Sequence, residues 1–235
     1  MIEGLSVTSL TAHYGAMRAL SGVSLTVHHG EVVSLIGANG AGKSTLLRSI
    51  AGYQRARGQD IRLNGEIVAG LAPHAIARKG VVLVPEGRRL FPDLTVTENL
   101  KIGAETRRAG DWTLDRVLQV FPALTERLSH RPGQLSGGQQ QMVAIGRALM
   151  SNPQILMLDE VSLGLAPKVI EELYAALPAI LSTGLGALIV EQDIGRALKA
   201  SDRFVTLREG TVVLEGASAT ADRHAITTAY FGAAA

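Results

Sequence analysis

The apolar residues of this chain gather in short runs that glycine, proline or polar residues bound on either side. Four such runs have the length of strands buried on both faces: Val32–Ile36, Val81–Val84, 155–158 and 187–190. From Ser136 onward the predicted strands alternate with helices. This pattern is typical of an α/β fold with a mostly parallel sheet.

Two regions have a different pattern. The first 30 or so residues alternate short apolar segments with turn-like residues, which predicts antiparallel strands. From about Leu94 to Leu128 the apolar residues follow a helical period, which predicts an inserted helical lobe. We therefore expect one domain, with a core made of residues 1–92 and 136–235 and a helical lobe made of residues 93–135.

The C-terminal part contains a predicted hairpin and a short helix. Residues 203–214 form two apolar runs that flank Glu209 and Gly210, a pair that favours a tight turn. The alanine-rich segment 225–235 predicts a short helix and a frayed end.

One uncharged stretch, residues 173–190, is long enough to cross a membrane. Pro178 and the polar, glycine-containing segment 182–186 divide it. We therefore expect a helix, a turn and a strand in place of a membrane span.

Composition excludes several classes of protein. At 235 residues the chain is long enough for one large α/β domain with an insertion, and it contains no cysteine for disulfides, thiolate metal sites or a thiol nucleophile. The net charge of +2 gives no reason to expect nucleic-acid binding. The N-terminus lacks a basic region followed by an apolar stretch, so no secretory signal is expected. His28 and His29 would face opposite ways on a strand, which favours surface residues over a metal pair.

A phosphate-binding loop follows the first buried run. Residues 37–45 read GANGAGKST, the pattern in which glycines let successive backbone N–H groups converge on phosphate oxygens at the start of a helix. Lys43 is expected to reach the β- and γ-phosphates of a nucleoside triphosphate, and Ser44 to ligate Mg²⁺. The predicted nucleotide contacts of this loop are Gly37, Asn39, Gly40, Ala41, Gly42, Lys43, Ser44 and Thr45.

A second motif, LSGGQ at residues 135–139, predicts another anion site. A serine hydroxyl and two glycines at the start of a helix leave bare N–H groups aimed outward. The residues expected to bind nucleotide here are Ser136, Gly137, Gly138 and Gln139. Two phosphate sites in one chain suggest that two chains share their nucleotides.

Two carboxylates end the apolar run at 155–158. Asp159 and Glu160 would lie at the carboxyl edge of the sheet, where open α/β sheets bind their ligands. Asp159 is expected to ligate Mg²⁺. Glu160 is expected to point to the other side of the strand and to polarise the attacking water.

These motifs together resemble the ATP-binding cassette (ABC) ATPases, and the resemblance covers nearly the whole chain. It implies ATP and Mg²⁺ as ligands, hydrolysis of ATP, and a dimer in which the LSGGQ segment of one subunit closes on the ATP of the other. It also implies that the aromatic residue Tyr14 stacks on adenine, with packing against the sheet edge as the alternative.

Three positions depart from the general pattern of these ATPases. Glu86 stands where most carry Gln, and its carboxylate is still able to ligate Mg²⁺. Gln192 stands at the switch position that His usually occupies; its amide is expected to donate a hydrogen bond to the γ-phosphate, but it does not ionise near neutral pH. Residues 163–166 lack the usual Asp.

Together with residues 84–89, 162–167 and 229–232, these departures resemble the LivF-type ATPases of branched-chain amino-acid importers. That branch implies a second ATPase subunit, LivG-like or identical, and transmembrane permease subunits that dock near residues 86–97. It also implies an extracytoplasmic solute-binding protein that feeds the permease, and a location at the cytoplasmic side of the membrane.

Two other kinds of ABC ATPase remain as alternatives. A soluble non-transport ATPase, such as an iron–sulfur assembly partner, would be expected to keep Gln and His at positions 86 and 192. A nucleic-acid-handling ATPase would need a coiled-coil or metal-binding insertion, and the sequence shows neither heptads nor cysteine clusters.

Overall fold

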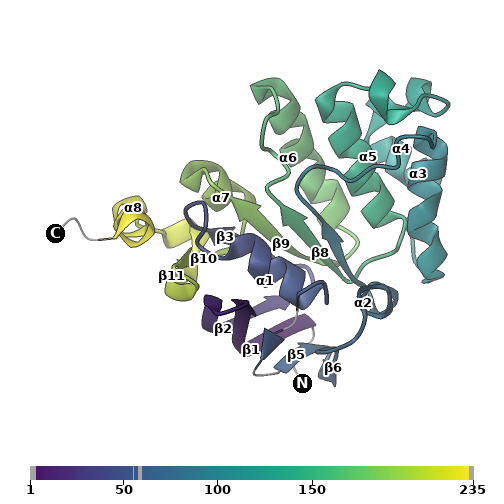
Figure 1. Ribbon diagram of the computed structural model, residues 1–235. Coiled ribbons are helices and arrows are strands. Elements are labelled where there is room, and N and C mark those ends of the chain that lie inside the picture. The colour runs from purple at the N-terminus through teal and green to yellow at the C-terminus, as the bar shows by residue number, and fades with distance from the viewer. Residues whose placement is uncertain (1–3, 55, 58–59, 233–235) are drawn as a thin grey trace.

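The computed structural model describes residues 4–54, 56–57 and 60–232 and consists of two sheets with helices packed on them (Figure 1). The frayed end predicted at the C-terminus falls partly on residues 233–235, which lie outside the described residues.

The N-terminal sheet is antiparallel, as the sequence predicts. Its strands run in the order β2-β1-β5-β6, and β4 pairs with β1. The bounds are β1 Gly4–Tyr14, β2 Met17–His28, β4 Ala56–Arg57, β5 Asp60–Leu63 and β6 Glu66–Ile67.

The main sheet has the order β11-β10-β3-β9-β8-β7, and all of its strand pairs are parallel except β10 with β11. The strands are β3 Val32–Ile36, β7 Val81–Val84, β8 Ile155–Asp159, β9 Gly186–Glu191, β10 Arg203–Arg208 and β11 Thr211–Ala217. Every residue of β3, β8 and β9 is buried. The sequence also predicted a fully buried β7, but Val82 and Leu83 are half-buried because this strand lies at the sheet edge and, among the described strands, pairs with β8 alone.

Helix α1 (Lys43–Ile50) packs against both sheets. Its apolar residues Leu46, Leu47 and Ile50 are fully buried in a cluster that contains residues of both sheets. The start of α1, where the phosphate loop ends, is therefore held rigidly relative to the carboxyl ends of the main-sheet strands.

The segment between β7 and β8 is helical, as its period predicts, but it is divided into short pieces. These are α3 Val96–Gly103, α4 Leu114–Val120 and α5 Gly137–Leu149, with the 3₁₀ turns η1 Ala104–Thr106, η2 Pro122–Arg127 and η3 Pro132–Gln134. Figure 1 shows α3 to α6 gathered at one end of the main sheet, away from the N-terminal sheet. Because α5 packs against both α3 and β7, the division into a core and a lobe at residues 93 and 135 remains a prediction.

The remaining helices are α2 Pro73–Lys79, α6 Pro167–Leu181, α7 Ile194–Ala200 and α8 Arg223–Phe231, with the 3₁₀ turn η4 Ser218–Thr220. The predicted helix, turn and strand in 173–190 are confirmed, but Pro178 lies inside α6 and does not end it. It comes three residues before the last residue of the helix, and its missing N–H removes one helical hydrogen bond. Within the described residues, no helix combines the length and the apolar character that a membrane crossing requires.

The predicted C-terminal hairpin is also confirmed. Strands β10 and β11 pair antiparallel, and the turn residues Glu209 and Gly210 have φ angles of 48° and 76°. Both angles lie in the left-handed region that a type I′ hairpin turn requires.

Candidate nucleotide site

The carboxyl ends of four neighbouring parallel strands surround one cavity of about 580 Å³. The phosphate loop follows β3, Glu86 follows β7, Glu160 follows β8 and Gln192 follows β9. The cavity is lined by Tyr14, Met17, Arg18, Ala19, Asn39, Gly40, Gly42, Lys43, Ser44, Thr45, Glu86, Glu160, Leu163, Gln192 and Glu209. The topology thus brings together residues that are far apart in the sequence, at the edge where an α/β sheet binds ligands.

The phosphate loop owes its shape to its glycines. Gly40 and Gly42 have φ angles of 83° and 104°, which favour glycine strongly. A Cβ on Gly37 would overlap the carbonyl oxygen of Leu207 in β10. Ala41 is buried and its carbonyl accepts a hydrogen bond from Gly210 N at 3.0 Å, so it anchors the loop to the hairpin turn. Gly37 and Ala41 therefore shape the loop from beneath and do not line the cavity.

Lys43 lies across this loop and is buried. Its Nζ donates to the carbonyl oxygens of Gly37 at 2.7 Å and Ala38 at 3.0 Å, and it pairs with Glu160 Oε1 at 3.3 Å. A full positive charge is thus held where the loop converges, which is what the terminal phosphates of a nucleotide need.

Glu160 lies between Lys43 and Gln192. Its Oε2 accepts a hydrogen bond from Gln192 Nε2 at 2.7 Å, so each of its two oxygens has one partner. The prediction for Glu160 relied on strand alternation, but β8 ends at Asp159 and Glu160 has a φ angle of 48°, so alternation does not set the direction of this side chain. Asp159 contacts Ser44, and Glu160 contacts the adjacent residue Lys43.

Asp159 is fully buried and lies beneath the cavity. Its Oδ1 accepts from Ser44 Oγ at 3.0 Å, while its Oδ2 has no hydrogen-bond partner among the described residues. Burial raises the pKa of this carboxyl above its usual range, the nearby charge of Glu160 adds to the rise, and the bond from Ser44 offsets part of it.

The oxygen atoms of Asp159, Ser44 and Glu86 suit Mg²⁺. A buried carboxylate oxygen without a partner, a hydroxyl and the carboxylate of Glu86 on the cavity wall are the hard ligands that Mg²⁺ prefers. Over the part of the chain that the structure describes, no group of three or more His, Cys, Asp or Glu residues is arranged to hold a metal ion. Mg²⁺ commonly binds through one or two carboxylates together with substrate phosphates, so the corner suits a metal that arrives with a nucleotide.

The LSGGQ segment lies elsewhere on the molecule. Ser136 is the N-cap of α5: its Oγ accepts from Gln139 N at 3.2 Å, and Gln139 Oε1 accepts from Ser136 N at 3.0 Å. Gly138 packs so closely that a Cβ would overlap Val169. Within the described residues, the cavity lining includes none of residues 136–139. The two predicted anion sites of one chain therefore do not meet in that chain.

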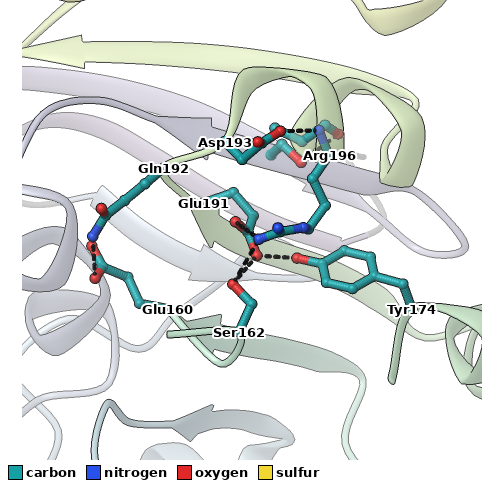
Figure 2. Close-up of polar contacts among 9 residues, drawn as sticks. Glu160, Ser162, Tyr174, Glu191, Gln192, Asp193 and Arg196 are labelled. Atoms are coloured by element: carbon teal, nitrogen blue, oxygen red, sulfur yellow. Dashed lines mark hydrogen bonds and ion pairs between the residues drawn. The ribbon is translucent and has the colours of Figure 1, made fainter. Parts of the chain in front are cut away.

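The sequence did not predict every residue around the site. Tyr14, which it did predict, ends β1, lines the cavity and is 42 % exposed. Met17, Arg18 and Ala19 of β2 also line the cavity, but they belong to no sequence motif. A network of Ser162, Tyr174, Glu191 and Arg196 adjoins Gln192 (Figure 2). The sequence feature that indicates this network is the glutamate at the end of an apolar strand, because a buried carboxylate needs hydrogen-bond partners.

The fold and the site define a phosphate-loop ATPase in which a mostly parallel sheet carries the nucleotide residues on its carboxyl edge. A family model described as ABC transporter matches residues 20–162. The chain belongs to the ABC transporter family of ATP-binding proteins.

Three curated relatives are named as branched-chain amino acid transport ATP-binding proteins, and others are named as import ATP-binding proteins for sulfate/thiosulfate or for spermidine/putrescine. It is 45 % identical over 217 residues to the high-affinity branched-chain amino acid transport ATP-binding protein BraG of Pseudomonas aeruginosa, covering 92 % of this chain and 93 % of that protein. It is 34 % identical over 233 residues to BraF of the same organism, covering 90 % and 91 %. It is 35 % identical over 215 residues to the probable branched-chain amino acid transport ATP-binding protein LivF of Archaeoglobus fulgidus, again covering 90 % and 91 %.

Solved structures agree with the fold. One, described as the ATP-binding subunit of an ABC transporter, superposes with a TM-score of 0.84 at 30 % identity and covers 97 % of this chain and 99 % of its own. Another is a dimeric ATP-binding cassette in a post-hydrolysis state bound to ADP and Pi, with a TM-score of 0.79 at 28 % identity over 91 % of this chain and 98 % of that chain.

Proposed function

We propose that this chain is the ATP-hydrolysing subunit of an importer for branched-chain or related amino acids. Its similarity to BraG, 45 % identity over nearly the full length of both chains, carries the assignment of the solute class. The arrangement of Lys43, Glu160 and Gln192 supports the chemistry.

ATP hydrolysis follows from this arrangement. Lys43 and the N–H groups of the phosphate loop hold the β- and γ-phosphates, and Tyr14 stacks on the adenine. Glu160 accepts a proton as the oxygen of a water molecule bonds to the γ-phosphorus, and the bond from that phosphorus to the oxygen of ADP breaks. Gln192 orients the carboxylate of Glu160 and donates to the γ-phosphate, so that the base is in place before the water arrives.

Ser44, Asp159 and Glu86 would hold Mg²⁺ at the buried corner of the site. The ion neutralises phosphate charge when it is bound. Asp159 contributes its unpartnered oxygen, and Ser44 contributes a hydroxyl that is already oriented toward Asp159.

A second ATPase subunit completes the nucleotide site. Ser136, Gly137, Gly138 and Gln139 lie outside the cavity of their own chain, and we propose that they act on the ATP of a partner, as the similarity to a dimeric cassette supports. BraF and BraG are two such proteins of one organism, and this favours a partner of the BraF or LivG type over a second copy of this chain.

We place the complex at the cytoplasmic side of a membrane, where permease subunits dock near residues 86–97 and a solute-binding protein supplies the permease from the other side. A soluble iron–sulfur assembly ATPase is not favoured. BraG and LivF are named as transport proteins, and residues 86 and 192 are Glu and Gln where the iron–sulfur class would be expected to carry Gln and His.

The test is transport by the complete complex. The chain, its second ATPase subunit and the permease are purified together and placed in vesicles with ATP at the ATPase face, and uptake of labelled leucine is measured in the presence of the binding protein. We expect leucine uptake that depends on ATP and is lost in Lys43→Ala. Equal uptake by Lys43→Ala, or uptake of spermidine or sulfate in preference to leucine, would reject the assignment.

A further inference from the structure

A buried carboxylate lies directly beside the catalytic residues and has no part in the proposed chemistry. Glu191 is the last residue of β9, only 2 % of it is exposed, and it immediately precedes Gln192. Burying a carboxylate in a sheet interior is unfavourable unless the group is paired and hydrogen-bonded. The hydrogen-bond and ion-pair partners of Glu191 therefore show how this buried carboxylate is stabilised.

Three side chains from three different elements converge on Glu191 (Figure 2). Ser162, in the loop after β8, donates to Oε1 at 2.8 Å, and the hydroxyl of Tyr174 in α6 donates to the same oxygen. Arg196 of α7 pairs with Oε2 at 3.2 Å and also donates to Ser162 Oγ at 3.1 Å. Both oxygens are thus partnered, and one carboxylate ties the β8 loop, α6 and α7 together.

The network is connected to both members of the catalytic pair. Ser162 lies two residues after Glu160, and Glu191 lies one residue before Gln192, while Gln192 Nε2 donates to Glu160 Oε2 at 2.7 Å. A cavity of about 260 Å³ adjoins the nucleotide cavity, and Glu160 and Gln192 line it together with Ser162, Glu191 and Arg196. Glu191 therefore holds the chain on both sides of the Glu160–Gln192 hydrogen bond.

The donors are suited to a fixed geometry. Burial raises the pKa of the Tyr174 hydroxyl, and the adjacent negative charge of Glu191 raises it further, so this hydroxyl stays protonated and remains a donor. The guanidinium of Arg196 also lies over the Tyr174 ring, 5.9 Å from its centroid. A buried ion pair is weak evidence for a role in stability, because apolar side chains of similar volume often stabilise a fold as well as the ion pair does.

We propose that Glu191 is a positioning residue for ATP hydrolysis. By fixing the loop that follows Glu160 and the backbone that precedes Gln192, it sets the orientation of the Glu160 carboxylate toward the attacking water. This inference rests on the proposed ATPase function and adds a residue that does not touch the nucleotide.

Glu191→Gln is the first variant to test. It keeps the shape and an acceptor for Ser162 and Tyr174, but it removes the charge and places an amide N–H₂ against Arg196. In the assembled complex we expect kcat to fall on the order of tenfold to a hundredfold, the loss that a misplaced catalytic group produces, with the KM for ATP nearly unchanged. Ser34→Ala is the matched control, since Ser34 Oγ is buried in β3 and donates to Ala197 in α7 at 3.0 Å without reaching the network.

A double-mutant cycle separates positioning from simple stability. Ser162→Ala and Tyr174→Phe each remove one donor to the same oxygen, so each should lower kcat in the wild-type background and have little further effect in Glu191→Gln. Thermal unfolding is measured for every variant, and Tyr174→Phe, the mildest change, serves if Glu191→Gln does not fold.

Two results would overturn the inference: a kcat for Glu191→Gln or Tyr174→Phe that matches Ser34→Ala, or losses that follow only the fraction of folded protein. In either case turnover by the wild-type complex would leave the proposed function standing. A wild-type complex without turnover would overturn both.

Discussion

Gln192 Nε2 donates a hydrogen bond to Glu160 Oε2 at 2.7 Å, while the other oxygen of Glu160 pairs with Lys43 at 3.3 Å. The carboxylate of Glu160 is therefore held between two donors, Lys43 and Gln192. We therefore propose that Gln192 acts on the carboxylate of Glu160 as well as on the γ-phosphate.

Two replacements of Gln192 test whether its hydrogen bond to Glu160 matters for turnover. Gln192→Ala removes the hydrogen bond to Glu160, and we expect turnover in the assembled complex to fall on the order of tenfold or more. Gln192→His should keep most of the activity because an imidazole N–H donates at similar reach. ATPase activity measured against pH for the three proteins checks this.

The pH profile carries the sharper contrast. An imidazole titrates near its ordinary pKa of about 6.5, so the ATPase activity of the His variant should change near that pH. Position 192 should cause no such change in the wild type, because an amide does not titrate there. An alanine variant as active as the wild type at every pH would show that Gln192 is a bystander.

Ser136→Arg should suppress hydrolysis without weakening ATP binding by the isolated chain. Ser136 is exposed and caps α5 outside the cavity of its own chain, so its loss costs the helix about 1 kcal/mol but leaves the phosphate loop intact. Thr113→Ala is the matched control, because Thr113 caps α4 in the same way. Calorimetric titration with ATP and turnover of the complex are compared for both variants. A Ser136→Arg monomer that no longer binds ATP would mean that the LSGGQ segment serves its own chain.

Burial of Asp159 predicts a pH-dependent stability of the nucleotide-free chain. Its pKa is raised in the folded state above the 3.8 of a solvated aspartate, chiefly by burial, so the folded state binds this proton more tightly than the unfolded state does. The contribution of this carboxyl to stability is therefore present below 3.8 and is lost as the pH rises through the raised folded value.

We expect Asp159→Asn to unfold at a higher temperature than the wild type near pH 7, in the presence of a chelator, with a gap that narrows as the pH falls toward 3.8. Asn still accepts from Ser44, whereas Asp93→Asn, which changes an exposed carboxylate, should leave the unfolding temperature nearly unchanged. Mg²⁺ with ATP should stabilise the wild type more than Asp159→Asn. A variant less stable than the wild type at pH 7 without ligand would contradict this account of the site.

Local patterns in the sequence were enough to predict the phosphate loop, the strands β3, β8 and β9, and the hairpin at Glu209 and Gly210. Each depends on neighbouring residues alone: glycine conformation, buried apolar runs and turn chemistry. The helical period of 94–128 predicted the kind of structure but not its division into short helices, which the packing of α3, α4 and α5 into one apolar cluster determines.

The contacts that orient Glu160 were beyond the reach of sequence patterns. The hydrogen bond from Gln192 requires β8 and β9 to be neighbours, and the left-handed backbone at Glu160 overrides the alternation of a strand. The partners of Glu191 come from elements whose order in space no local pattern contains. Topology and side-chain packing, not residue type, decide these contacts.

The role of Glu160 is the central claim, and Glu160→Gln tests it most directly. The amide keeps the shape of the side chain and an acceptor for Gln192, but it loses the basic oxygen that takes the proton from water. The measurement is the affinity for ATP together with steady-state turnover in the assembled complex, alongside the wild type. We predict ATP binding within a few-fold of wild type, turnover lowered by at least about a hundredfold, and accumulation of an ATP-bridged dimer on sedimentation. Turnover equal to that of the wild type would contradict the account.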